Sequence, residues 1–154
     1  MPGKNDPICW KEKHKNSAAY AYQGRQNYME DRFSIFEDIG DSDISLYGVF
    51  DGHAGDFAAQ FATDILMPTI RDKIIDILKY IKSKTEVKQQ KTIEKTSGII
   101  EDKKDSIEVV EEDPLQNYVT TENTVDYSKI LTEEILAADD KLIERTSVSS
   151  QKSH

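Results

Sequence analysis

Two short acidic motifs hold the side chains in this sequence that could do chemistry. Glu30 and Asp31 stand in "YMED", just before an apolar run, and Asp51, Gly52 and His53 stand in "FDGHAG", just after another. Carboxylate oxygens suit hard cations such as Mg²⁺ and Mn²⁺, and a glycine lets a backbone carbonyl come close to an ion. A histidine beside such an ion could donate a proton to a leaving oxygen. Together the motifs indicate a candidate metal-assisted hydrolytic site.

Each motif taken alone also has an ordinary structural explanation. Asp-Gly is one of the commonest turn dipeptides, and a lone histidine such as His53 is more often a surface residue than a catalyst. An EF-hand is excluded because Leu46 occupies the place where that loop requires glycine. A structural zinc site does not fit one cysteine and three scattered histidines. Only the joint placement of the two motifs favours a functional site.

The elements around the motifs decide whether they can meet. Strands are expected near 18–24, 31–39 and 44–52, and the turn signal "GDSD" at 40–43 joins the last two into an antiparallel β-hairpin. The start of the first strand of this hairpin then lies beside the end of the second, which brings Glu30 and Asp51 to the same end. The uncharged run 47–50 predicts a central strand that is buried on both faces.

Helical patterns follow the second motif. Asp56 is expected to cap a first helix through its carboxylate, and Pro68 is expected to interrupt that helix before a second one that runs to about residue 81. Helical spacing returns from Tyr127 to Arg145. The apolar stripe of these helices would pack on the sheet, so the fold class is α+β, with antiparallel strands and flanking helices.

Composition bounds the remaining possibilities. The chain has 154 residues, a net charge of -9 and a pI near 4.8, which argues against a nucleic-acid partner. The single cysteine, Cys9, allows no intramolecular disulfide. No apolar run approaches the roughly 20 residues that span a bilayer, and no secretory signal stands at the start. A soluble protein of the cytoplasm or the nucleus is the expectation.

The chain divides into segments of different character. Residues 1–17 are expected to be a polar tail or an edge segment, 18–82 and 125–148 to be the folded part, and 149–154 a C-terminal tail. Half of the residues in 82–113 are Lys, Asp or Glu and none is aromatic, so 83–124 is expected to be a charged, flexible insertion.

The two motifs with their flanks carry a family resemblance. "QGRQNYMEDRFSIF" and "LYGVFDGHAGDFAAQF" resemble the start of a metal-dependent protein serine/threonine phosphatase of the type 2C (PPM) family, and "GR..YMEDRF" is most similar to its 1-like (L) branch. The resemblance implies an αββα sandwich of two antiparallel sheets and a pair of Mg²⁺ or Mn²⁺ ions. It implies that Asp51 bridges the ions, Gly52 offers its carbonyl, Glu30 holds an ion and His53 is the general acid. The reaction implied is hydrolysis of phosphoserine or phosphothreonine in a phosphoprotein substrate.

Two departures from the family pattern set further expectations. Where the family places a phosphate-binding arginine, this chain has Gln26, and Arg25 stands one place earlier as the candidate substitute. A shift of one residue along a strand reverses the face to which a side chain points. The segments that supply further metal-binding aspartates in the family are absent from this sequence. The chain is therefore expected to be the N-terminal part of a truncated catalytic domain, inactive by itself, with a partner covering the open sheet. The alternative is a catalytically inactive truncated product that acts as a binding or regulatory fragment.

Overall fold

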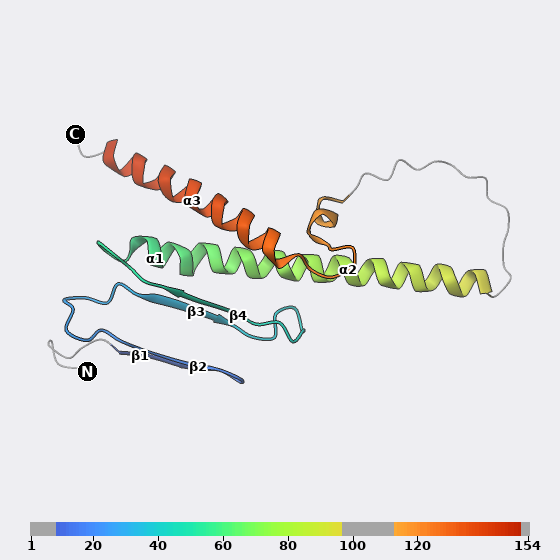
Figure 1. Cartoon of the computed structure of the whole chain (residues 1–154), viewed down its shortest axis with the longest axis horizontal. Helices are drawn as coiled ribbons and strands as arrows, with labels where there is room; N and C mark the ends of the chain where they lie inside the picture. The colour runs from blue at the N-terminus through green and yellow to red at the C-terminus, as the bar shows by residue number, and fades with distance from the viewer. Residues whose placement is uncertain (1–8, 97–112, 152–154) are drawn as a thin grey trace.

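The computed structural model describes residues 9–96 and 113–151 of the chain (Figure 1). Strands β1 (Cys9–Lys13), β2 (Ala18–Tyr22), β3 (Arg32–Phe36) and β4 (Leu46–Phe50) come first. They are followed by α1 (Phe57–Phe61), the π-helical turn η1 (Ala62–Leu66), α2 (Met67–Thr96), the 3-10 turn η2 (Pro114–Tyr118) and α3 (Tyr127–Gln151). The described part is thus mixed α and β, with antiparallel strands and flanking helices. This agrees with the expected α+β class, while the full sandwich stays a prediction.

The strands form two separate antiparallel hairpins. β3 pairs with β4 so that Arg32 lies opposite Phe50, which confirms the predicted hairpin and places both acidic motifs at one end of it. β1 pairs with β2, so part of the expected polar tail is a strand. Figure 1 shows this first hairpin on the side of β3–β4 away from the helices. Trp10 of β1 contacts Phe33 of β3, with ring centroids 6.5 Å apart.

Strand β4 is buried on one face only, so the prediction that 47–50 is buried on both faces is wrong. Tyr47 and Val49 are 54% and 83% exposed. In the part of the chain that the structure describes, β4 pairs with β3 alone. Its other face packs on the helices so tightly that a Cβ added to Gly48 would lie 2.8 Å from the sulfur of Met67. An uncovered apolar face is therefore present, and what covers it stays a prediction.

The first two helices run into one another without a break at Pro68, contrary to the sequence-based expectation. The π-helical turn η1 precedes α2, and Pro68 is the second residue of α2. A π turn is wider than an α turn and makes room for the proline ring, which would otherwise clash with the preceding turn. Asp56 does stand at the N-cap position of α1, but its carboxylate makes no cap hydrogen bond and pairs instead with Arg32.

The boundary of the expected insertion also differs in the structure. Helix α2 continues to Thr96, so residues 83–96 are helical, and 114–118 form η2. The part of the expected insertion at 97–112 lies outside the described residues, and its flexibility stays a prediction. Helix α3 extends to Gln151, which takes in the first residues of the expected C-terminal tail at 149–154. Residues 152–154 lie outside the described ranges.

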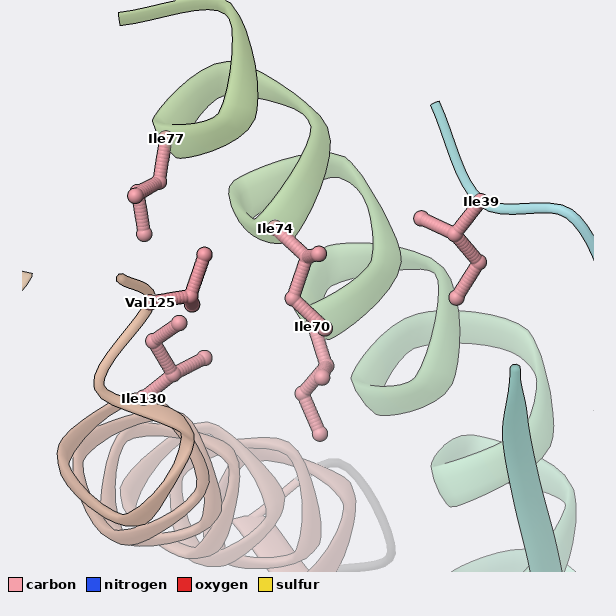
Figure 2. Close-up of a cluster of buried hydrophobic side chains, with 6 residues drawn as sticks. All are labelled: Ile39, Ile70, Ile74, Ile77, Val125 and Ile130. Carbon is pink, nitrogen blue, oxygen red and sulfur yellow. The ribbon is translucent and has the colours of Figure 1, made fainter. Parts of the chain in front are cut away.

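The apolar core lies where α2 meets α3 and the two loops beside them. Three isoleucines on one stripe of α2 face Ile130 of α3, and the turn after β3 adds one more side chain (Figure 2). The buried cluster consists of Ile39, Ile70, Ile74, Ile77, Val125 and Ile130. The helical spacing of 70, 74 and 77 is the signal that predicted this stripe. Among the described residues, no helix is long and apolar enough to span a membrane.

Candidate functional site

The acidic end of the β3–β4 hairpin opens into a cavity of about 510 Å³. Both sequence motifs contribute to its wall, together with the segment that joins β2 to β3. The lining residues are Tyr22, Gln23, Gln26, Asn27, Tyr28, Met29, Glu30, Asp31, Asp51, Gly52, His53 and Ala54. The structure thus brings Glu30, Asp51, Gly52 and His53 to one cavity, as their placement on the hairpin predicted. Their roles in binding or catalysis stay predictions.

Gly52 lies directly against the backbone of Glu30. A Cβ atom added at Gly52 would stand only 2.3 Å from the carbonyl oxygen of Glu30, so no residue with a side chain fits without moving that backbone. The Gly52 amide also donates a hydrogen bond to Oδ1 of Asp31 over 3.4 Å. The glycine of the second motif is therefore required by its close approach to the first motif.

The turn after His53 holds the carboxylate of Glu30. Ala54 and Gly55 both have positive φ, 58° and 112°, which turns the chain so that the Gly55 amide donates to Oε1 of Glu30 at 3.0 Å. A left-handed conformation is unfavourable for a residue with a Cβ, so Ala54 is a strained position on the cavity wall. His53 precedes this turn with an exposed side chain. The imidazole is accordingly open to a ligand that enters the cavity.

Similar sequences are found among curated protein phosphatases. Protein phosphatase 1L of Bos taurus is 37% identical over 68 residues, 44% of this chain and 19% of the bovine protein. Probable protein phosphatase 2C 56 of Oryza sativa subsp. japonica is 43% identical over 51 residues, 32% of this chain and 14% of the rice protein. Probable protein phosphatase 2C 2 of Arabidopsis thaliana is 39% identical over 59 residues, 38% of this chain and 16% of the plant protein.

The chain is related to the type 2C protein phosphatases. It spans less than a fifth of the length of the curated relatives that it matches. No protein-family model matches the sequence, and no solved structure does.

The departure from the type 2C pattern at the expected phosphate-binding position is visible in the cavity. Gln26 lines the cavity, whereas Arg25 is exposed and is not among the lining residues. The Gln26 carbonyl accepts a hydrogen bond of 2.6 Å from Nε2 of Gln23, which fixes the backbone of this segment. Arg25 as a phosphate-binding residue stays a prediction, and the structure offers it no place on the cavity wall.

The electrostatics of the cavity are one-sided. Among the described residues, its lining includes three carboxylates, those of Glu30, Asp31 and Asp51, and no lysine or arginine. Such a lining attracts cations and repels a phosphate group unless a cation lies between them. This sign of charge agrees with the metal dependence that the type 2C resemblance implies.

The oxygen ligands of the cavity are of the type that Mg²⁺ or Mn²⁺ prefers, but they are too few to complete the coordination of either ion. Carboxylate oxygens and the Gly52 carbonyl are hard ligands of the right kind. Mg²⁺ needs about six oxygen ligands in near-octahedral geometry. Across the described residues 9–96 and 113–151, no group of three or more acidic, histidine or cysteine side chains is arranged to hold an ion. Water or further carboxylates would have to supply the remaining ligands.

Sequence reasoning missed part of the cavity wall. Tyr22 and Tyr28 are 55% and 63% exposed and line the cavity together with the carboxylates. Tyr28 belongs to the "YMED" motif, so its position beside Glu30 gave a usable signal. Tyr22 ends a strand that pairs with β1, and no spacing rule links it to either acidic motif. The contacts of Arg32 were missed as well, although this residue directly follows Asp31.

Proposed function

We propose that this chain forms part of the catalytic domain of a metal-dependent protein phosphatase that acts on phosphoserine and phosphothreonine in proteins. One observation carries the proposal: Glu30 and the Asp51–Gly52–His53 turn share one acidic cavity in a chain related to type 2C phosphatases. The phosphorylated side chain of the substrate would enter this cavity.

The chain's own carboxylates would hold the cations. In this proposal Asp51 and Glu30 supply oxygen ligands to Mg²⁺ or Mn²⁺, and Gly52 supplies its carbonyl. When bound, two such ions offset the charge of the phosphate and lower the pKa of a bound water. The Gly55 amide contributes by keeping the Glu30 carboxylate turned toward the 52–55 turn.

His53 would handle the leaving group. Hydrolysis joins a water oxygen to phosphorus and breaks the bond between phosphorus and the serine or threonine oxygen. That leaving oxygen takes up negative charge and needs a proton. The protonated imidazole of His53, exposed at the cavity wall, could donate it as a general acid. Gln26 and the neighbouring amides would meet the phosphate without adding a positive charge.

A segment exchange tests the proposed function. The 68 residues that align with bovine protein phosphatase 1L replace the corresponding segment of that protein, and phosphate release from a phosphothreonine peptide is measured with Mn²⁺. We expect the chimaera to be active. Asp51→Asn in it should reduce kcat at least about a hundredfold, because a metal ligand is lost. Asp43→Asn, in the turn at the far end of the hairpin, is the matched control and should leave kcat unchanged. A chimaera as active with Asp51→Asn as without it would contradict the proposal.

The 154-residue chain is expected to give no measurable turnover by itself. Glu30 and Asp51 offset two charges, whereas two divalent ions bring four, and like ions so close repel each other. The described residues offer no cluster of three ligands to correct this imbalance. Turnover by the isolated chain that disappears with Asp51→Ala would show that its own donors suffice.

A further inference from the structure

The side chain of Arg32 contacts the backbone of the first acidic motif, helix α1 and the N-cap residue of that helix. Its Nη1 donates to the carbonyl oxygens of Met29 and Asp31, both at 2.9 Å. Its Nε donates to Oε1 of Gln60 at 2.6 Å, and its Nη2 forms an ion pair with the carboxylate of Asp56. The side chain is only 13% exposed although it is charged. An arginine is seldom buried to this degree unless its donors are paired, as they are here.

These partners belong to two segments that are distant in the sequence. Met29 and Asp31 flank Glu30 on either side, so the bonds from Arg32 fix the backbone that carries this carboxylate. Asp56 is the N-cap residue of helix α1, directly after the turn that contains Gly55, and Gln60 lies within this helix. The guanidinium therefore ties the first motif to the helix that follows the second. The hydrogen bond from Gly55 to Glu30 spans the same gap.

The first hairpin covers the remaining face of the guanidinium. The Arg32 carbon Cζ lies 4.8 Å from the ring centroid of Trp10, a distance at which the ring attracts a cation. Trp10 also contacts Phe33, so the ring is itself held in place on β3. A ring over one face keeps water away, which strengthens the ion pair with Asp56. The segment expected to be a polar tail thus helps to hold the acidic end of the second hairpin.

We propose that Arg32 is a positioning residue, which sets Glu30 against the turn at 52–55 through its planar, forked set of donors. The effect of Arg32 on catalysis rests on the proposed function, whereas its effect on the position of Glu30 does not. A lysine at this position would keep the charge, but its point-like ammonium cannot bond two carbonyls, an amide and a carboxylate in one plane. The position of Glu30 therefore depends on the forked geometry of the arginine donors more than on their charge.

The test compares Arg32→Lys with a matched control. Arg71 also lies over an aromatic ring, 4.7 Å from the centroid of Phe36, and pairs with Asp72 at 2.7 Å, away from the cavity. Amide hydrogen exchange of Gly52 and Gly55 is measured by NMR in the full chain. In Arg32→Lys both amides should exchange about tenfold faster, because their carboxylate acceptors lose a fixed position. In Arg71→Lys these two rates should not change.

Several outcomes would overturn the proposal or separate it from the proposed function. Equal exchange rates in Arg32→Lys and the unchanged chain would show that the fork is dispensable. If Arg32→Lys does not fold, Asp56→Asn keeps the shape of one partner and removes its charge. It should raise the Gly55 rate about threefold, and an unchanged rate there would also overturn the proposal. A Mn²⁺ titration of the unchanged chain is the second measurement. If this chain binds no Mn²⁺, the proposed function is contradicted, whereas the hydrogen-exchange result for Arg32 still holds.

Discussion

The helical end and the cavity end of this molecule are held together by different interactions. Where α2 meets α3, Ile77 and Ile130 are fully buried among apolar side chains. At the acidic end of β3–β4, Asp51 and His53 are exposed, and order comes from hydrogen bonds to Glu30 and from the contacts of Arg32. The first region gains stability from the apolar area that it buries. The second keeps polar groups open to ligands, and its arrangement depends on a few directional bonds.

The largest effect is expected at the helical end. Ile77→Ala removes a fully buried side chain and leaves a cavity between α2 and its neighbours, which should lower the free energy of unfolding by about 2–5 kcal/mol. Urea unfolding followed by circular dichroism measures this change. Ile135 of α3 is 50% exposed, so Ile135→Ala is the matched control and should lower the free energy of unfolding far less. Equal losses in the two variants would show that the cluster in Figure 2 does not stabilise the fold.

An intermediate effect is expected from Gly52→Ala at the cavity end. The added Cβ would stand 2.3 Å from the Glu30 carbonyl oxygen, so the two motifs must move apart, at a cost of about 1–3 kcal/mol. The shift should weaken the bond from Gly55 to Glu30, which NMR detects as a change in the Gly55 amide resonance. Ala54→Gly is the contrasting variant. It relieves the left-handed strain at φ 58° and should stabilise the chain slightly. A Gly52→Ala variant with unchanged stability and an unchanged Gly55 resonance would contradict the close packing.

The helical end should loosen at alkaline pH. Partial burial lowers the pKa of Lys73, but its hydrogen bonds to Glu134 and Tyr118, both 2.8 Å long, outweigh this and raise the pKa above the ordinary 10.5. A raised pKa in the folded state contributes stability below pH 10.5, and this contribution is lost as the pH rises through the folded value. Unfolding curves between pH 9 and 12 measure it. Lys73→Met should make the stability decline less steeply with rising pH. An equally steep decline in that variant would show that other groups cause it.

The smallest effect is expected at the junction of the two hairpins, at acid pH. The hydroxyl of Ser17 donates to Glu37 at 2.5 Å, and this bond, with that from the Asn16 amide, lowers the pKa of Glu37 below the ordinary 4.5. A lowered pKa contributes stability above pH 4.5, which is lost as the pH falls through the folded value. Fluorescence of Trp10, the single tryptophan, reports on this junction. Glu37→Gln should reduce the change in fluorescence and stability as the pH falls. An unchanged pH dependence in this variant would show that Glu37 does not cause it.

The sequence predicted local elements better than it predicted exposure. The hairpin at 32–50 and the stripe Ile70–Ile74–Ile77 were predictable because side-chain periods of two and of 3.6 residues are local properties. The burial of Tyr47 and Val49 was mispredicted because burial depends on which elements cover a strand, and the pattern of one strand does not contain that information. The uninterrupted helix at Pro68 depends on a π turn that no propensity rule anticipates.

The candidate site could likewise be predicted only in part from the sequence. The meeting of Glu30 and Asp51 at one cavity could be predicted, since hairpin pairing fixes which strand ends are neighbours. The contacts of Arg32 with Gln60 and Asp56 could not, because they join segments through side chains whose directions follow from packing. Gln26 lies on the cavity wall and Arg25 lies outside it, but residues 24–28 form turns and bends, and residues 26–31 all line the cavity, so the alternation of an extended strand does not account for this difference.

The central claim is that the acidic end of β3–β4 binds a divalent cation through Glu30 and Asp51, and Mn²⁺ binding followed by electron paramagnetic resonance tests it most directly. The unchanged chain should bind one Mn²⁺ weakly. Asp51→Asn and Glu30→Gln should each reduce the affinity by at least about tenfold, since each removes a hard oxygen ligand. Asp43→Asn, in the turn at the opposite end of the hairpin, should leave the affinity unchanged. Equal Mn²⁺ affinity in all four proteins would contradict the claim.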